Sequence, residues 1–301
     1  MDRFEALHRE LTRRCPDLDL RVDEPMSHHT SFRIGGPAAL MALPKSEEEA
    51  VAAVQAAAEL EIQPFFMGNG SNLLVPDEGV NRFLVKAVPG LCECRVEDTR
   101  IFAGSGITLA RLAVFARDSR LTGLEFAHGI PGSLGGAVTM NAGAYDGEMS
   151  HLIRSVTCLT QAGEKNSVTD FGFGYRHSAF SDGSRMILAA KLELAWGDVK
   201  DIGAKMEQLS AQRQSKQPLE YPSAGSMFKR PPSHFAAALI EQCGLKGLAV
   251  GGAQVSEKHA GFVVNRGGAT CGHVLELVAQ VRQRVLAQTG VELEMEVRIL
   301  R

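Results

Sequence analysis

The segment YPSAGSMFKRPP, residues 221–232, places one hydroxyl where it can approach a bound molecule. Two small residues, Ala224 and Gly225, precede Ser226 and let the backbone come close to a ligand. A pair of prolines stiffens the exit from the segment. It contains no G-x-S-x-G motif and no obvious neighbouring base, which disfavours a hydrolase nucleophile. A proton donor held against a ligand and an ordinary Ser/Gly turn remain as the alternatives.

Two glycine-rich loops are the next candidates for chemistry. GNGSN, residues 68–72, lies between two short apolar runs rather than before a helix, so it is not a dinucleotide-binding G-x-G-x-x-G motif. Consecutive small residues can still direct backbone N–H groups at an anion. GIPGSLGGAVTMNAGA, residues 129–144, carries little charge and is typical of a loop that wraps a flat anionic cofactor, although each loop alone is also typical of a turn. The candidate cofactor contacts are Gly68, Asn69, Gly70, Ser71, Asn72, Gly129, Pro131, Gly132, Ser133, Gly135, Gly136, Asn141, Ala142 and Gly143.

Three further residues are ambiguous when each is taken alone. Arg176 in YRHSAF has the character of a surface arginine, and Glu296 is expected on the wet face of an edge strand. His259 in SEKHAGF is more often a structural histidine than a ligand contact. None of the three indicates a reaction without its neighbours.

Composition restricts the class of protein. The chain has 301 residues, of which 45% are hydrophobic and 22% are charged, as in ordinary globular proteins with two or three domains. A formal net charge of −3 and the absence of long runs of like charge argue against nucleic-acid binding. Residues 202–301 hold 12 Lys and Arg against 8 Glu, which fits either an anionic substrate or a chance fluctuation.

No membrane span, secretion signal or metal site is expected. The longest apolar runs are shorter than 18 residues, and the N-terminal segment is charged throughout. Six cysteines form no C-x-x-C pair, and the nine histidines form no H-x-x-x-H pattern. We therefore expect free thiols in a reducing cytoplasm and no obligate protein partner.

The elements that must position these residues follow from periodicity and caps. A first helix is expected with Phe4, Leu7 and Leu11 on one face, and a second should begin at a Ser46/Glu49 capping box. Further helices are expected to begin after Thr108, Asp198 and Thr270, and one more should span 233–243. Strands are expected at 65–67, 73–75, 83–85, 153–160 and 186–194, and in the alternating segment 291–300. The fold class is α+β, with divisions near residues 85 and 197.

Taken in order, several segments resemble one family. HHTSFRIGGPA, GNGSNLLV, GIPGSLGGAVTMNAGAYDGE, YRHSAF, PSAGSMFKRP, GLKG, SEKHAGFVVN and LEMEVRIL are similar to segments of the UDP-N-acetylenolpyruvoylglucosamine reductase (MurB) family of peptidoglycan precursor synthesis. The resemblance implies a two-subdomain FAD-binding fold of the vanillyl-alcohol-oxidase (PCMH) type over residues 1–85 and 86–197. A C-terminal α+β substrate domain would span 198–301. The short spacing between YRHSAF and PSAGS resembles the shorter form of the family, without an extra tyrosine-bearing loop.

The same resemblance implies cofactors and roles. Such enzymes use non-covalent FAD, with NADPH as co-substrate, to reduce the enolpyruvyl group of a UDP-sugar. Ser226 matches the proton donor, while Arg176 and Glu296 match the groups that polarise the substrate carboxylate. The implied substrate contacts are Tyr175, Lys216, Lys229, Arg230, Lys246 and His259.

Two other classes stay open at this point. An oxidase of the same flavin fold would pass electrons from a small alcohol or hydroxy acid to oxygen. A non-catalytic nucleotide-binding protein would use the glycine loops for binding alone.

Overall fold

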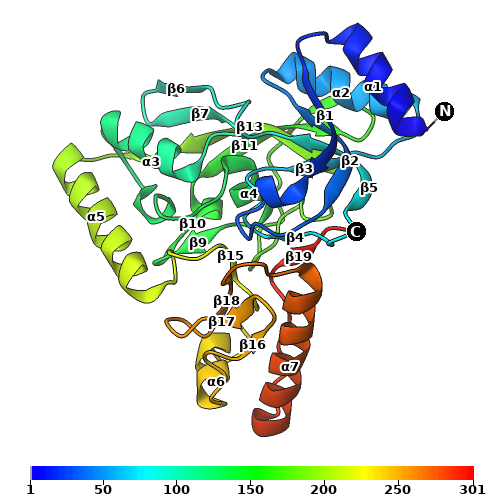
Figure 1. The fold of residues 1–301 in the computed structure, drawn as a ribbon. Coiled ribbons are helices and arrows are strands. Elements are labelled where there is room, and N and C mark those ends of the chain that lie inside the picture. The colour runs from blue at the N-terminus through cyan, green and yellow to red at the C-terminus, as the bar shows by residue number, and fades with distance from the viewer. Residues whose placement is uncertain (1) are drawn as a thin grey trace. The chain divides into compact units, whose positions relative to one another are not determined.

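The computed structural model describes residues 2–301 and divides them into two compact units (Figure 1). Unit 1 consists of residues up to Val22, Ala39–Asn69 and Arg82–Gln212. Unit 2 consists of Asp23–Ala38, Gly70–Asn81 and Arg213–Arg301. The chain thus passes between the units several times, and the expected division near residues 85 and 197 stays a prediction.

The N-terminal part of unit 1 contains two helices. Helix α1, Arg3–Arg14, buries Phe4, Leu7 and Leu11, which confirms the predicted apolar face. Helix α2, Glu47–Glu59, begins after Ser46, whose Oγ accepts a hydrogen bond from the backbone N–H of Glu49 at 3.2 Å. The Glu49 carboxylate accepts from the N–H of Lys45 at 2.7 Å, so only the serine half of the predicted capping box forms.

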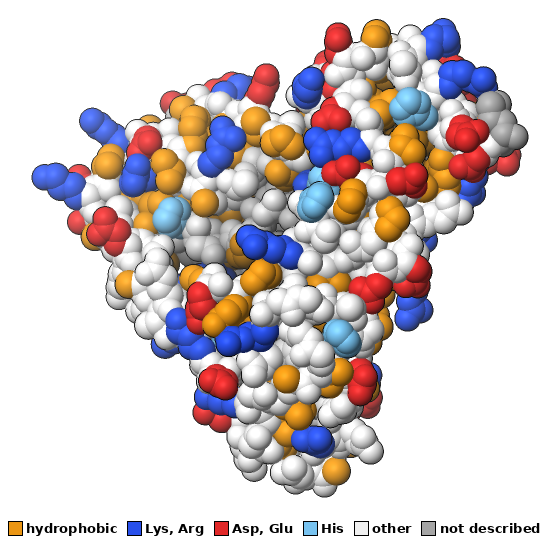
Figure 2. Space-filling view, viewed as in Figure 1, with side chains coloured by type: hydrophobic (Ala, Val, Ile, Leu, Met, Phe, Trp, Pro, Cys, Tyr) orange, Lys and Arg blue, Asp and Glu red, His pale blue; other side chains and the backbone are white. Residues whose placement is uncertain are grey.

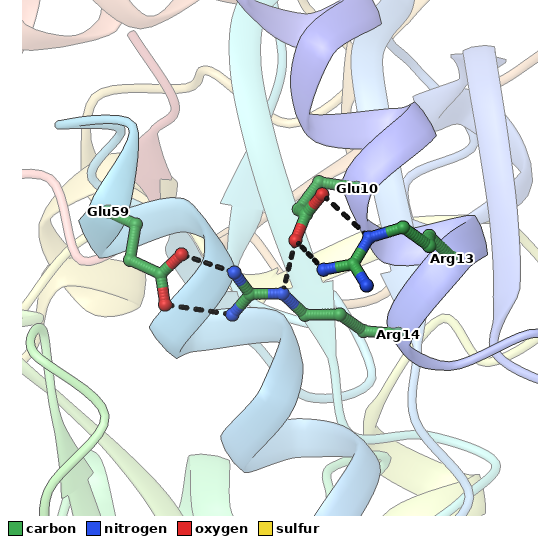
Figure 3. Close-up of polar contacts among 4 residues, drawn as sticks. All are labelled: Glu10, Arg13, Arg14 and Glu59. Carbon is green, nitrogen blue, oxygen red and sulfur yellow. Dashed lines mark hydrogen bonds and ion pairs between the residues drawn. The ribbon is translucent and has the colours of Figure 1, made fainter.

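A cluster of charges joins these two helices (Figure 3). The Arg14 guanidinium donates to both carboxylate oxygens of Glu59, and its Nε donates to Glu10 at 2.5 Å. Arg13 binds the same Glu10 carboxylate at 2.6 Å. Hydrogen bonds from Arg13 and Arg14 lower the pKa of Glu10 to about 2, so this carboxylate stays ionised between two cations.

Two sheets form the body of unit 1. One has the order β1-β2-β5-β3, in which β3 and β5 run parallel; the strands are β1 Asp19–Pro25, β2 Pro37–Leu43, β3 Phe65–Met67 and β5 Val80–Lys86. The other is antiparallel with the order β12-β11-β13-β7-β6; its strands are β6 Cys94–Glu97, β7 Arg100–Gly104, β11 Ile153–Thr160, β12 Lys165–Val168 and β13 Arg185–Glu193. Short pairs complete the unit: β8 Leu121–Thr122 with β14 Ala195–Trp196, and β9 Gly143–Ala144 with β10 Gly147–Glu148.

Three helices accompany the antiparallel sheet of unit 1. Thr108 caps α3, Leu109–Asp118, through a bond from the N–H of Arg111, as predicted. The short helix α4, Leu134–Thr139, lies within the second glycine loop. Asp198 caps α5, Val199–Lys216, and Ile202 and Met206 of α5 join the same apolar core as α3. Single 3₁₀ turns lie at η2 Glu125–Ala127 and η3 Met149–His151.

Unit 2 has a separate apolar core. Its sheet is antiparallel with the order β15-β18-β17-β16; the strands are β15 Ser223–Ser226, β16 Ala249–Val250, β17 Ala253–Val255 and β18 Phe262–Asn265. Helices α6, Ala236–Gln242, and α7, Cys271–Thr289, pack with it, and the 3₁₀ turn η1 spans Met26–His28. Thr270 and His273 form a capping box that opens α7, while Gly290, with φ +71°, closes it as predicted. The Asp77 carboxylate also accepts bonds from the first N–H groups of α7.

The predicted strand over 291–300 is wrong in extent. Only β19, Arg298–Ile299, forms a ladder, parallel to β4, Leu73–Leu74. Before it, the chain bonds a different neighbour: Lys229 N donates to Glu294 O, and Glu296 N donates to Met227 O. The alternating sequence is extended, but because its hydrogen bonds change partner midway, no continuous strand results.

Candidate functional site

The first glycine loop, residues 68–72, combines close packing with unused backbone donors. A Cβ on Gly68 would lie 2.2 Å from Ser133 Oγ, and one on Gly70 would lie 2.0 Å from the carbonyl oxygen of His29. Neighbouring protein atoms therefore leave no room for a Cβ at either position, and only glycine fits there. Gly70 has φ +63°, and within residues 2–301 the N–H groups of Gly70 and Ser71 meet no hydrogen-bond acceptor. Such a left-handed turn with free N–H groups suits an anion.

The second glycine loop, residues 129–144, packs on the first within unit 1. The Asn69 side chain donates to Pro131 O at 2.9 Å, and Gly68 touches Ser133. The N–H groups in the first turn of α4 are hydrogen-bonded to other parts of the protein. Leu134 N donates to Ile107 O, and Gly135 N donates to Ser105 O, both at 2.9 Å. Because these N–H groups are already bonded, the loop can offer a cofactor its surface but not the donors at the start of α4.

Gly135 and Gly136 differ in the space beside them. A Cβ on Gly135 would lie 2.9 Å from Ser105 Cβ, whereas one on Gly136 would meet only Ser133 Oγ, at 3.7 Å. Gly136 is also exposed. The described protein thus leaves room for a Cβ at Gly136 but not at Gly135, and Gly136 is the position where an external molecule can come against the backbone.

Asn141 is predicted as a cofactor contact, but its side chain is hydrogen-bonded within the protein. It is 4% exposed, with φ +42°. Its Nδ2 donates to Gly174 O at 3.2 Å and to Glu148 Oε1 at 3.3 Å, and its Oδ1 accepts from Ser150 N at 2.9 Å. These bonds use both donor hydrogens, so the side chain is arranged to hold neighbouring segments. Ala142 and Gly143 continue into the β9–β10 pair, where Gly143 faces Glu148.

Arg176 lies in a tight turn of unit 1. Gly174 and His177 exchange backbone hydrogen bonds of 3.0 and 3.2 Å, and Arg176 between them has φ +55°. The Arg176 Nε is buried, and the guanidinium lies 5.6 Å from the ring centroid of Tyr175, which is 59% exposed. A positive φ is unfavourable for arginine, so the surrounding contacts must hold this residue in the left-handed conformation.

An ionised carboxylate lies near this turn. The hydroxyl of Ser150 donates to Glu148, and this bond is the main reason that the pKa of Glu148 is lowered. Asn141, His151 and the positive charge of Arg176 lower it further. The charges of Glu148 and Arg176 therefore stabilise each other within unit 1.

Ser226 and Glu296 lie on adjoining segments of unit 2. A bulge separates Ser223 from Ser226 in β15, and Gly225 has φ +78° with no atom within 4 Å of the point that a Cβ would occupy. The Ser226 hydroxyl has no hydrogen-bond partner within residues 2–301. Its neighbour Met227 accepts a bond from Glu296 N at 2.9 Å, so the two predicted catalytic residues lie on adjoining segments. The backbone beside Ser226 is open, as its sequence indicated.

Glu296 is held from both sides within unit 2. Its N–H donates to Met227 O at 2.9 Å, and its carbonyl accepts from Asn72 Nδ2 at 3.2 Å. Arg298 N also donates to Asn72 O at 3.0 Å. Asn72, predicted as a cofactor contact, therefore fixes the backbone that carries Glu296.

The predicted substrate cations differ in their surroundings. Lys229 pairs with Glu294, and Lys246 pairs with Glu241 at 2.5 Å. The Arg230 guanidinium lies 4.0 Å from the ring centroid of Phe235. Lys216, at the end of α5, is exposed and has no ion pair within the described residues. Figure 2 shows the same mixture, with blue and red side chains interspersed over the visible surface.

His259 is half-buried, and its hydrogen bond identifies which ring nitrogen carries the proton. Its Nδ1 accepts from Gly261 N at 3.2 Å, which places the proton of the neutral ring on Nε2. Burial lowers its pKa, and the nearby positive charge of Lys246 lowers it further. The ring also meets Phe262 edge-on at 5.0 Å. A neutral His259 presents an N–H to a ligand at neutral pH.

We expect His259 to titrate below its ordinary value of about 6.5. Because the folded-state pKa lies below the unfolded one, its contribution to stability is complete above about pH 6.5 and is lost as pH falls through the folded value. An NMR titration of the ring Cε1 proton measures this directly, and His259→Gln should flatten the pH dependence of Tm in that window. A midpoint at or above 6.5 would contradict the burial argument.

The described residues contain no metal-binding group of three or more His, Cys, Asp or Glu side chains. All six cysteines are free thiols. Burial raises the pKa of Cys94 and Cys271 to about 11, so both remain protonated at neutral pH. None of the helices in the described part is long and apolar enough to span a bilayer.

Sequence reasoning missed the residues that hold the site together. Ser31 donates through Oγ to Ser223 O at 2.6 Å and through its N–H to Gly70 O at 3.2 Å, so it links the first glycine loop to β15 within unit 2. Ser178 and Ser181 both donate to Thr139 O, at 2.8 and 3.0 Å. Ser31 and Ser178 lie in the motifs HHTSFRIGG and YRHSAF, but only the fold identifies the partners of these serines.

Comparisons with known proteins identify related domains and related chains. Residues 38–168 match the family model of an FAD binding domain, and residues 217–300 match UDP-N-acetylenolpyruvoylglucosamine reductase, C-terminal domain. The chain is 44% identical to UDP-N-acetylenolpyruvoylglucosamine reductase of Syntrophomonas wolfei, over 95% of this chain and 96% of that one. The enzyme of Clostridium perfringens strain SM101 is 43% identical, over 100% of this chain and 99% of the relative.

A solved structure gives the same result. The UDP-N-acetylenolpyruvylglucosamine reductase (MurB) of Thermus caldophilus superposes with a TM-score of 0.79 at 34% identity, covering 94% of this chain and 99% of that one. The predicted α+β fold with an FAD-binding part and a C-terminal part is confirmed. The C-terminal match also favours the reductase over an oxidase or a nucleotide-binding protein. The chain therefore belongs to the UDP-N-acetylenolpyruvoylglucosamine reductase (MurB) family of FAD-dependent oxidoreductases.

Proposed function

We propose that this protein reduces UDP-N-acetylenolpyruvoylglucosamine to UDP-N-acetylmuramate with NADPH, in the cytoplasmic synthesis of peptidoglycan precursors. The single observation that carries the proposal is the placement of Ser226 and Glu296 on adjoining segments: an unbonded hydroxyl beside an open left-handed glycine lies on one segment, and a carboxyl group is carried by the other. The family membership supplies the substrate class, and the free thiols fit a reducing compartment.

The residues present fit FAD, which supplies hydride to the substrate when bound and recovers it from NADPH. The unbonded N–H groups of Gly70 and Ser71 suit a diphosphate. The open backbone at Gly136 suits close contact with a flat group. We therefore propose that both glycine loops hold FAD, with Gly68 and Asn69 shaping the first loop and Pro131 and Ser133 the second.

Ser226 is proposed to give its proton to the substrate carbon beside the new C–H bond. Hydride addition at the enolpyruvyl methylene places negative charge on the carboxylate and the adjacent carbon, and a proton must reach that carbon. The Ser226 hydroxyl is a small donor with no competing partner in the described chain. Such general-acid assistance typically contributes about 10²–10⁴-fold to the rate.

Arg176 and Glu296 are proposed to stabilise the charge that develops on the carboxylate. The guanidinium stays cationic, and its placement in a closed turn reduces the reorganisation needed during reaction. Glu296 can assist only if it is protonated or bonded through a partner, because a bare carboxylate would repel the developing charge. Its backbone is fixed by Met227 and Asn72, which limits where its side chain can point.

The anaerobic spectrum of the purified protein tests the function as a whole. We expect a yellow protein that NADPH bleaches and that the enolpyruvyl substrate recolours without oxygen. Recolouring by oxygen but not by the substrate would indicate the oxidase alternative. A colourless protein that FAD cannot reconstitute would be neither the reductase nor the oxidase.

We expect Lys216→Ala to raise the substrate KM by about tenfold while leaving kcat nearly unchanged, because a charge-assisted contact contributes roughly 1.5–3 kcal/mol to binding. Lys216 has no ion pair in the described chain that would compete for its charge. Added salt should raise the wild-type KM and have less effect on the variant. The matched control is Lys200→Ala at the opposite end of α5. A fall in kcat with unchanged KM would place Lys216 in the chemical step instead.

A further inference from the structure

The turn that carries Arg176 is tied to the end of α4 at several points, all within unit 1. Asn141, two residues beyond α4, donates to Gly174 O at 3.2 Å. On the other side of Arg176, the hydroxyls of Ser178 and Ser181 donate to the carbonyl of Thr139, the last residue of α4, at 2.8 and 3.0 Å. The arginine turn is therefore bracketed by bonds to one short helix end.

The side chain of Asn141 is suited to holding this turn. It is 4% exposed, and its amide makes three bonds to the protein, one each to Gly174, Glu148 and the backbone of Ser150. Its φ of +42° is a backbone conformation that asparagine tolerates better than most residues. A buried amide with all these contacts satisfied fixes its partners in one geometry.

We infer that Asn141 is a positioning residue for Arg176: by bonding Gly174 it holds the left-handed turn that directs the guanidinium toward the substrate carboxylate. The inference rests on the proposed role of Arg176 and adds a residue that acts through it. It also gives α4 a second use, because the helix begins in the glycine loop assigned to FAD and ends on the turn of Arg176.

Asn141→Asp tests this with the smallest change in shape. The carboxylate keeps the acceptor for Ser150 N but sets an oxygen against Gly174 O and Glu148 Oε1, which removes the bond to the turn. We expect reoxidation of the reduced flavoenzyme by UDP-N-acetylenolpyruvoylglucosamine to slow by about 10- to 100-fold, as for a misplaced catalytic group. Flavin content and the rate of reduction by NADPH should stay unchanged.

A second readout is independent of activity. Amide hydrogen exchange over residues 172–178 should become faster in the variant, while exchange in β11 and β13 stays as in the wild type. Asn141→Gly, which tolerates the same positive φ, is the second variant if the aspartate prevents folding. Ile101→Val, in the core of the same unit, provides a control with lowered stability and an intact turn.

A double-mutant cycle separates this inference from the proposed function. If Asn141 acts through Arg176, adding Asn141→Asp to Arg176→Ala should change reoxidation by less than about twofold. Additive losses of rate, or unchanged exchange over 172–178, overturn the inference. If Arg176→Ala alone reoxidises at the wild-type rate, the proposed role of Arg176 is wrong, and the exchange measurement alone then decides whether Asn141 holds the turn.

Discussion

Ser226→Ala is expected to slow reoxidation of the reduced flavoenzyme by substrate by about 10²–10⁴-fold and to leave reduction by NADPH nearly unchanged. In the proposed mechanism, the proton from Ser226 is needed only when the substrate carbon is protonated. Gly225, with φ +78° and open space beside it, brings the backbone close, and the Ser226 hydroxyl has no other partner within residues 2–301. Anaerobic stopped-flow measurements of the two half-reactions separate these effects.

The same strand provides the controls for Ser226. Ser223→Ala makes the identical chemical change three residues earlier in β15, where the carbonyl and not the hydroxyl holds Ser31. This variant should reoxidise at close to the wild-type rate. Ser226→Cys should retain more activity than Ser226→Ala because a thiol can still donate a proton. Equal reoxidation rates in Ser226→Ala and the wild type, with chemistry limiting in both, would exclude the acid role and leave Ser226 as a turn former.

Local rules predicted the elements whose ends are capped by their own sequence. Thr108, Asp198 and Thr270 each accept bonds from the helices that they precede, and Gly290 ends α7 in the left-handed conformation. These signals act within four residues and therefore need no knowledge of the rest of the fold. The apolar face of α1 is predictable for the same reason, since its period alone selects the side that is buried.

Prediction failed where a segment depends on distant partners. The alternation over 291–300 is that of a strand, yet the chain bonds residues 227–229 first and β4 afterwards. Alternation specifies which side chains are buried but not which backbone lies alongside. This change of partner is also what brings Glu296 next to Met227, one residue from Ser226. The feature that the sequence pattern could not specify is thus the one that places the two proposed catalytic residues of unit 2 on adjoining segments.

The glycine loops show the same limit. Composition identified both loops but treated all their glycines alike. The fold distinguishes Gly68 and Gly70, which have no room for a Cβ among protein atoms, from Gly136, which has room. It also shows that Asn141 and Asn72 hold the backbone of the segments that carry the predicted arginine and glutamate. Asparagine in a cofactor-loop motif is therefore weak evidence of cofactor contact unless its amide is unoccupied.

Gly136→Val is expected to weaken FAD binding by at least about tenfold, equivalent to roughly 1.4 kcal/mol, without unfolding the protein. Gly136 is exposed, its φ is not in the left-handed region, and a Cβ there meets only Ser133 Oγ, at 3.7 Å. Gly136→Ala should even stabilise the cofactor-free protein by about 0.5–1 kcal/mol, because alanine is favoured over glycine inside a helix. Any loss of flavin would then indicate a clash between the new side chain and the bound cofactor, not a clash within the protein. The absorbance of bound flavin in the visible range and the Tm of the cofactor-free protein measure the two effects.

Two other glycines make this test specific. Gly203 lies in helix α5, and the nearest atom to a Cβ there is Arg117 Cδ, at 3.9 Å. Gly203→Val therefore repeats the substitution in a helix that belongs to neither glycine loop, and this variant should keep its flavin. Gly135→Ala should instead lower the Tm, because its Cβ would lie 2.9 Å from Ser105 Cβ. Full flavin occupancy in Gly136→Val would show that this loop is only a turn, since the protein itself has space for the added Cβ. Loss of flavin in Gly136→Val but not in Gly203→Val requires the cofactor to lie against the backbone of α4.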